Sequence, residues 1–298
     1  MCGIVGLYLK DPTLQPQLGS LLGAMLLEMS ERGPDSAGFA VYRDPVDGGT
    51  VKLTLFHPDR HYPWRTLTAR LGDDLDTPVD GEMRATHLVM QVAARPEQVR
   101  HWLDAHHPEV KIMGMGEVIE IYKEKGSPEQ VARRFELAKI AGSHALGHTR
   151  MATESAVTTE HSHPFSTGLD LCLVHNGSLS NHNRLRRWLT KRGIRFQTDN
   201  DSEVAAGYLT HRLREGATLK EALDAALRDL DGFYTFAVGT RDGFAVLRDP
   251  IACKPAVMAE TDAWVAMASE YRALDSLPGV EKARLWEPEP ATVYAWGR

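Results

Sequence analysis

Apolar runs bounded by glycine alternate with amphipathic segments along most of this 298-residue chain. Residues 2–8, CGIVGLY, place apolar side chains between glycines and predict a short buried strand. Leucines and methionines then recur at helical spacing over residues 18–29, and Gly33 follows just beyond the last turn. Because residues 37–43 again read as a strand, strand and helix patterns alternate from the start of the chain.

The pattern changes character between about residues 44 and 143, and we interpret this segment as an inserted α/β subdomain. It has its own alternation, which includes VKLTLF, PEQVRHWLDAHH and KIMGMGEVIEIYKE. Its last helix is predicted to begin after Ser127, because Ser127 and Gln130 have capping-box spacing and Pro128 takes the first helical position.

Strands and amphipathic helices return from His144 onward. Helices are predicted near 182–192, from about 202 to 215 and near 218–230, the last opening with Thr218 and Glu221 at capping-box spacing. Closely spaced strand patterns follow, and Arg241-Asp242-Gly243 indicates a hairpin between two of them. Strands flanked by helices at both ends of the chain predict a layered α/β sandwich.

The composition is that of a soluble globular protein, with 43% hydrophobic residues and a formal net charge of -6. Acidic residues outnumber basic ones and no stripe of lysine and arginine occurs, which argues against a nucleic-acid-binding or anionic-membrane surface. No leader-like segment and no apolar run approaching ~18 residues is present, so we expect a cytoplasmic protein.

The three cysteines are widely spaced and give little support to a disulfide framework or a zinc–thiolate site. Cys172 and Cys253 are expected to be small buried hydrophobic residues. Cys2 differs, because removal of Met1 would place its thiol beside a free α-amino group. Such a group has a pKa of roughly 7.7 to 8.0 and can act as the base. The alternative is an ordinary buried cysteine in a first strand.

Further motifs follow Cys2 along the chain. They are Arg32-Gly33-Pro34-Asp35-Ser36, Gly147-His148-Thr149-Arg150-Met151-Ala152-Thr153, His175-Asn176-Gly177 and Asn200-Asp201-Ser202-Glu203, followed by LRDP with KP within 247–255 and by ASE at 268–270. Together with MCGIVG, they resemble the class II glutamine amidotransferases, whose glutaminase domains are N-terminal-nucleophile hydrolases. The resemblance covers about residues 1–43 and 144–275. It implies an α+β fold, the four-layer αββα sandwich of those hydrolases, as one domain over 1–298 interrupted at about 44–143.

The resemblance also implies a role for each candidate site residue. Cys2 would attack the side-chain amide of glutamine, and Asn176 with Gly177 would donate to the developing oxyanion. Arg150 would grip the substrate carboxylate and Asp201 its ammonium group. Thr153 would add substrate contacts, and Arg32 would position the amino terminus. Taken alone, His-Asn-Gly also fits a turn and Asp201 a helix start, and both interpretations can hold together.

Two positions depart from the family pattern. The residue after Arg150, usually aromatic there, is Met151, and the residue after Thr153 is Glu154. A flexible thioether softens the wall of the pocket, so a substituted γ-glutamyl amide as well as glutamine is a candidate substrate. His161 and His163 are two residues apart, yet no third ligand at matching spacing accompanies them, and we predict no metal site.

The family usually fuses its glutaminase domain to a synthase domain, but about 200 residues remain here once the insertion is subtracted. We therefore expect ammonia to pass to separate synthase chains. The nearest resemblance is to the amidotransferase-like subunit of N-methylglutamate synthase and of split glutamate synthases. It implies partners similar to the FMN and iron–sulfur synthase domain and to the β-helix domain of glutamate synthase, with no cofactor in this chain.

Two alternatives belong to other classes of protein. If Met1 is retained, the nitrogen of Cys2 is an amide, and the chain would be a non-catalytic subunit of such a complex. The other alternative is a different N-terminal-nucleophile amide hydrolase, such as an acylase of penicillins or bile salts. Arg150 and Asp201 argue against that alternative, because together they would anchor both ends of an amino acid.

Overall fold

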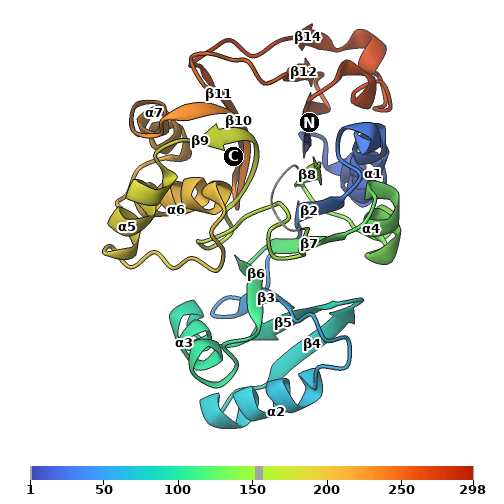
Figure 1. The fold of residues 1–298 in the computed structure, drawn as a ribbon. Helices are drawn as coiled ribbons and strands as arrows, with labels where there is room; N and C mark the ends of the chain where they lie inside the picture. The colour runs from blue at the N-terminus through green and yellow to red at the C-terminus, as the bar shows by residue number, and fades with distance from the viewer. Residues whose placement is uncertain (1, 152–156, 298) are drawn as a thin grey trace.

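The computed structural model describes residues 2–151 and 157–297 (Figure 1). Among these residues no helix is long and apolar enough to cross a membrane. Three antiparallel sheets form the framework, two of them face to face in the main body and the third in a small separate lobe.

The first sheet has seven strands, and β1 and β8 lie near its centre. Every neighbouring pair in it is antiparallel. In spatial order its strands are β14 (Arg284–Trp286), β12 (Val257–Glu260), β13 (Trp264–Ala268), β1 (Gly3–Leu9), β8 (His144–Arg150), β2 (Ser36–Tyr42) and β7 (Ile119–Lys125).

The second sheet has four antiparallel strands, and the predicted hairpin through Arg241-Asp242-Gly243 joins two of them. Its strands are, in spatial order, β15 (Val293–Gly297), β11 (Gly243–Arg248), β10 (Gly232–Thr240) and β9 (Cys172–Leu179).

Helices cover the outer face of each sheet (Figure 1). On the first sheet they are α1 (Leu18–Glu28) and α4 (Pro128–Arg134), and on the second α5 (His182–Thr190), α6 (Asp201–Arg214) and α7 (Leu219–Asp229). Both predicted capping boxes are present, at Ser127 with Gln130 and at Thr218 with Glu221. Short 3-10 turns complete the chain, at Pro12–Gln17, Ser30–Arg32, Leu137–Lys139, Tyr271–Ala273 and Val280–Lys282.

Three hydrophobic clusters separate these layers. One packs α1 and Phe135 against the first sheet, and another packs α5, α6 and α7 against the second. The third lies between the two sheets and includes Ile4, Leu146, Val174 and Phe244. Helices, sheet, sheet and helices therefore follow one another, which confirms the expected αββα sandwich.

The small subdomain is built on the third sheet, with strands in the order β4 (Val79–Arg84), β5 (His87–Val92), β3 (Val51–Phe56) and β6 (Lys111–Gly116). Helices α2 (Trp64–Leu75) and α3 (Pro96–His106) pack on it around a core of its own. This lobe is shorter than the segment 44–143 expected for the insertion. The reason is that β7 pairs with β2 over seven residues, so the chain from Ile119 onward belongs to the main body.

A buried carboxylate ties the small subdomain to the first sheet. Glu120 on β7 accepts hydrogen bonds from Lys52 on β3, from Arg43 and from the hydroxyl of Tyr122. Glu120 and Lys52 are only 2% and 4% exposed. Removing one partner of such a buried pair would leave an uncompensated charge, so this contact favours the docking of the lobe on the main body.

Candidate active site

Cys2 lies directly before β1, where the first sheet meets several other elements. Gly3 pairs with Thr149 of β8, and the side chain of Met29 lies 2.8 Å from the position of a Cβ on Gly3. Ile4 donates its N–H to Ser269 Oγ at 2.9 Å, and Ser269 returns its own N–H to the Ile4 carbonyl. The start of the chain is therefore fixed on both sides, while Cys2 itself stays partly exposed.

Two candidate residues contact Cys2 directly. The Cys2 carbonyl accepts hydrogen bonds from Arg32 Nε and from Asn176 Nδ2, each at 3.2 Å. Arg32 also forms an ion pair with Glu270 at 2.7 Å, which joins the RGPDS and ASE motifs. Sequence reasoning treated Ala268-Ser269-Glu270 as a signature without a role. The structure shows that Ser269 and Glu270 support the amino terminus.

Asn176 and Gly177 lie inside β9, so this Asn-Gly pair does not form a turn. Gly177 has φ of 148°, and a Cβ there would lie 2.0 Å from the Phe233 carbonyl. Only glycine fits such a close approach between β9 and β10. The second sheet thus brings Asn176 to Cys2 across the interior of the sandwich, 174 residues away along the chain.

Arg150 is the last residue of β8 and is 7% exposed. The RGPDS loop packs against this strand end, because Asp35 donates its N–H to the Arg150 carbonyl and a Cβ on Gly33 would lie 2.4 Å from Arg150 N. Met151 follows with 38% of its surface exposed. Thr153 lies outside the described residues, so its predicted role stays a prediction.

Asp201 is the first residue of α6, and Asn200 caps the helix by accepting from Ser202 N at 2.8 Å. One Asp201 oxygen, Oδ2, accepts the N–H of Leu179 at the end of β9. The helix start and the candidate carboxylate role therefore coincide at one residue, next to the strand that carries Asn176.

A buried histidine cluster lies beneath these residues, and sequence reasoning missed it. His163 Nε2 and His175 Nδ1 each lie 2.8 Å from Ser202 Oγ, and the His148 ring stacks on that of His163 with centroids 3.9 Å apart. His148 Nε2 in turn contacts the His175 carbonyl at 3.1 Å. Part of the signal was present in the sequence, because His148, His175 and Ser202 are immediate or near neighbours of the candidate site residues.

Burial keeps these imidazoles uncharged. It lowers the pKa of His148 to about 3, and burial together with the neighbouring His148 places the pKa of His163 well below the ordinary histidine value. Burial also lowers the pKa of His175, although the charge of Asp201 opposes the shift. Neutral rings have one donor and one acceptor each, so a single Ser202 hydroxyl can donate to one ring and accept from the other.

The two other cysteines have different surroundings. Cys172 is fully buried in β9 and accepts a hydrogen bond from the Tyr42 hydroxyl, and burial raises the pKa of its thiol to about 12. Cys253 is exposed, so the expectation that it is buried is wrong. It lies in the loop between β11 and β12.

Comparisons with known proteins indicate the family of this chain. A family model described as a glutamine amidotransferase domain matches residues 148–276. The glutamine amidotransferase-like protein GlxB of Rhizobium meliloti is 57% identical over 99% of this chain and 98% of its own length. An amidophosphoribosyltransferase of Archaeoglobus fulgidus is 32% identical over all of this chain but only 49% of its own length.

Solved structures extend the likeness to the fold. The glutamine phosphoribosylpyrophosphate amidotransferase of B. subtilis, complexed with ADP and GMP, superimposes with a TM-score of 0.63 at 22% identity. The match covers 99% of this chain and 47% of that one. The sandwich, the motifs in their order and the relative of equal length lead to one conclusion: the chain belongs to the class II glutamine amidotransferase family.

Proposed function

We propose that this chain, after removal of Met1, hydrolyses the side-chain amide of glutamine or of another γ-glutamyl amide, with Cys2 as the nucleophile. The observation that carries the proposal is the convergence of Arg32 and Asn176 on the Cys2 carbonyl. It brings the candidate oxyanion donor against the residue that bears the thiol. Membership of the amidotransferase family supports the same reaction.

The reaction proceeds through a thioester. The Cys2 sulfur attacks the δ-carbon of the side-chain amide while its proton passes to the α-amino group of Cys2. The carbon–nitrogen bond then breaks, and the proton leaves with the nitrogen as ammonia. The same amine takes a proton from water, whose oxygen attacks the thioester. Glutamate is released, and the proton returns to the sulfur.

The remaining site residues bind the substrate and stabilise charge. The amide of Asn176 and the N–H of Gly177 donate to the oxyanion, which is worth about 2.7 to 4 kcal/mol for one such donor. Arg150 binds the substrate carboxylate and Asp201 its ammonium group, with Thr153 on the same segment as Arg150. Met151 forms a soft wall, which leaves room for a substituted amide.

Intact-mass spectrometry with a glutamine-analogue diazo-ketone tests this mechanism. We expect the purified chain to lack one methionine and to gain one adduct, located at Cys2. The exposed Cys253 is a control within the same molecule, because a general thiol reagent such as iodoacetamide labels it while the diazo-ketone does not. Glutamine added in excess slows the labelling at Cys2.

Two results would contradict the mechanism. Retention of Met1 in the protein purified from its native cells removes the proposed base and supports a non-catalytic subunit. Full glutaminase turnover in Cys2→Ala removes the proposed nucleophile. A Cys253→Ala variant serves as the matched control and is expected to retain both labelling and turnover.

We further propose that the ammonia passes to separate synthase chains, similar to the FMN and iron–sulfur domain and the β-helix domain of glutamate synthases. The lengths of the relatives support this arrangement. The Rhizobium protein matches almost end to end, whereas the amidophosphoribosyltransferase is about twice as long as the part matched here. Glutamine would then be hydrolysed in one chain and its nitrogen used in another.

Affinity purification of the tagged full chain from its native cells tests the partnership. We expect chains of those two kinds to co-purify in fixed ratio, and glutaminase turnover to be at least about tenfold higher in the complex than in the isolated chain. An isolated monomer with the full turnover of the cell extract would overturn the proposal.

A further inference from the structure

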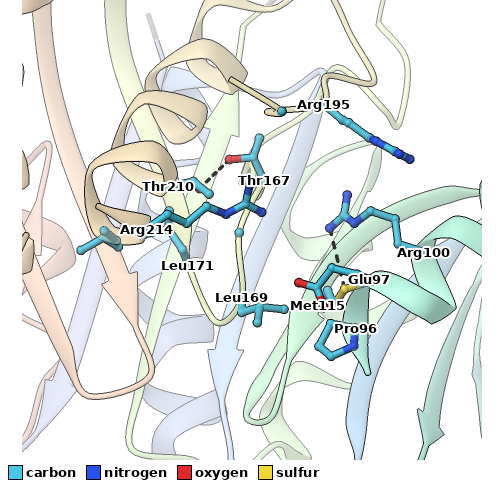
Figure 2. A pocket seen from close by; sticks show the side chains of 13 residues that line it. Pro96, Glu97, Arg100, Met115, Thr167, Leu169, Leu171, Arg195, Thr210 and Arg214 are labelled. Carbon is cyan, nitrogen blue, oxygen red and sulfur yellow. Dashed lines mark hydrogen bonds between the residues drawn. The ribbon is translucent and has the colours of Figure 1, made fainter. Parts of the chain in front are cut away.

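A cavity of about 500 Å³ lies between the small subdomain and the helices of the second sheet (Figure 2). Helix α3 lines it from the small subdomain with Glu97 and Arg100. The last part of α6 lines it from the main body with Thr210 and Arg214, and a loop lines one side with Thr167, Gly168, Leu169 and Leu171. Its volume is in the range typical of sites for small molecules.

Three arginines line this cavity from three separate elements. Figure 2 shows the side chains of Arg100, Arg195 and Arg214 around the same space. Arg195 pairs with Asp104, but Arg100 and Arg214 form no ion pair with a carboxylate among the described residues. Of the described lining residues Glu97 alone is acidic, so positive charge is in excess.

The excess charge is poorly compensated. Burial and the nearby charges of Arg214 and Arg195 lower the pKa of Arg100, although Arg100 stays protonated at neutral pH. Arg100 Nη2 donates to the weakly accepting Met115 Sδ at 3.7 Å. Glu97 offsets only part of the charge on Arg100, and a bound anion would reduce the remaining repulsion between the arginines.

The rest of the lining suits a compact ligand with a short apolar part. Thr167 Oγ1 and Thr210 Oγ1 lie 2.8 Å apart, and their hydroxyls reach the cavity wall. Met115, Leu169 and Leu171 supply apolar surface, and Leu169 is 51% exposed. Guanidinium groups bind carboxylates and phosphates through paired N–H donors.

We propose that this cavity binds a small dianion, held by Arg100, Arg195 and Arg214. Phosphates and dicarboxylates share the required chemistry, because each carries two negative charges on oxygen atoms within one small molecule. The site is separate from the candidate active site, and its occupancy does not depend on the reaction proposed above.

Isothermal titration calorimetry on the full chain tests binding, with inorganic phosphate, pyrophosphate and glutarate as probes in about 150 mM sodium chloride, where weak surface binding is screened. We expect saturable binding of at least one probe, and the probe that binds identifies the phosphate or the dicarboxylate class. Arg100→Gln and Arg214→Gln should each weaken binding at least about tenfold, whereas the exposed Arg60→Gln should leave it unchanged.

Thermal unfolding separates a ligand site from a structural role. Without probe, Arg100→Gln should unfold at the same temperature as the wild type or higher, because it relieves repulsion. The binding probe should raise the midpoint of the wild type and of Arg60→Gln but not that of Arg100→Gln or Arg214→Gln.

Two outcomes overturn the proposal. One is the failure of all three probes to bind the wild type saturably. The other is equal binding by Arg60→Gln, Arg100→Gln and Arg214→Gln. Glutaminase turnover is not measured in these experiments, so they do not test the proposed reaction. Conversely, a lack of glutaminase activity would not contradict anion binding in this cavity.

Discussion

At the scale of single residues, the Asn176-Gly177 pair shows how tertiary contacts select between two local tendencies. Asn-Gly is a strong turn signal, yet here it continues β9 because both flanks pair with β10. The positive φ of Gly177 is then used for a close approach to the Phe233 carbonyl. The same backbone places the side chain of Asn176 against Cys2.

Replacing Gly177 with alanine should disturb both packing and chemistry. The new Cβ would lie 2.0 Å from the Phe233 carbonyl and 2.9 Å from His175 Nε2, so β9 must shift. If the proposed function holds, kcat for glutamine should fall by about 10² to 10³, as for loss of one oxyanion donor. Steady-state kinetics measures the effect.

Gly216→Ala is the matched control for Gly177→Ala. Gly216 also has a positive φ, of 90°, but no atom lies within 4 Å of its Cβ position. It should therefore share the backbone strain, about 1 to 2 kcal/mol, without loss of turnover. Equal kinetics in the two alanine variants would show that the position of Gly177 has no part in the reaction.

At the scale of elements, one serine joins three pieces of the site. Ser202 of α6 contacts His163, from the loop before β9, and His175 of β9. His175 is in turn bound to His148 of β8 through its carbonyl. Helix and strands from both sheets are thus linked beneath the residues proposed to bind substrate.

Ser202→Ala should leave two buried imidazole nitrogens without their shared partner. An unsatisfied buried group costs about 1 to 3 kcal/mol, so the free energy of unfolding in urea should fall by about that amount. Ser202 Oγ also lies 3.4 Å from Asp201 Oδ1, and its loss should therefore raise KM for glutamine more than it lowers kcat.

Ser276→Ala is the control for Ser202→Ala, because Ser276 is exposed and its hydroxyl donates to the Ala273 carbonyl of its own turn. It should change the free energy of unfolding by less than about 0.5 kcal/mol. A KM unchanged in Ser202→Ala, despite the loss of stability, would show that Ser202 supports the fold alone and does not position Asp201.

At the scale of the whole molecule, neutral buried histidines occur in more than one layer. Burial lowers the pKa of His87 to about 3, of His144 to about 4 and of His148 to about 3. In the unfolded chain they titrate near their ordinary value of 6.5. The unfolded state therefore binds more protons below that pH, and acid favours it.

We expect the free energy of unfolding contributed by these histidines to be fully present above about pH 6.5 and to decrease as the pH falls from there toward 4. Each of these histidines should lower the free energy of unfolding by about 1.4 kcal/mol per pH unit over that range. Urea unfolding at a series of pH values measures the slope. His144→Gln should reduce this slope by the contribution of one histidine, whereas His101→Gln, at an exposed position, should leave the slope unchanged. A stability independent of pH between 6.5 and 5 would contradict this account.

The elements whose signals are local were predicted well. The helices at 182–192 and 218–230 and both capping boxes depend on contacts within a few residues, and the structure confirms them at His182–Thr190, Leu219–Asp229 and their caps. The end of the small lobe differs from the expected residue 143, because the alternation of Ile119–Lys125 suits either sheet. Its place depends on pairing with β2, about 80 residues earlier.

The amino-acid sequence by itself determined the periodicity of helices and strands, the order of the motifs and the residue types available for chemistry. The tertiary structure alone decided which of these residues meet. Asn176 reaches Cys2, Glu270 reaches Arg32, and three arginines line one cavity, each through long-range packing of sheets and helices. The physical reason is that local propensity acts over a few residues, whereas strand register and burial of apolar surface bring together groups that no local pattern relates.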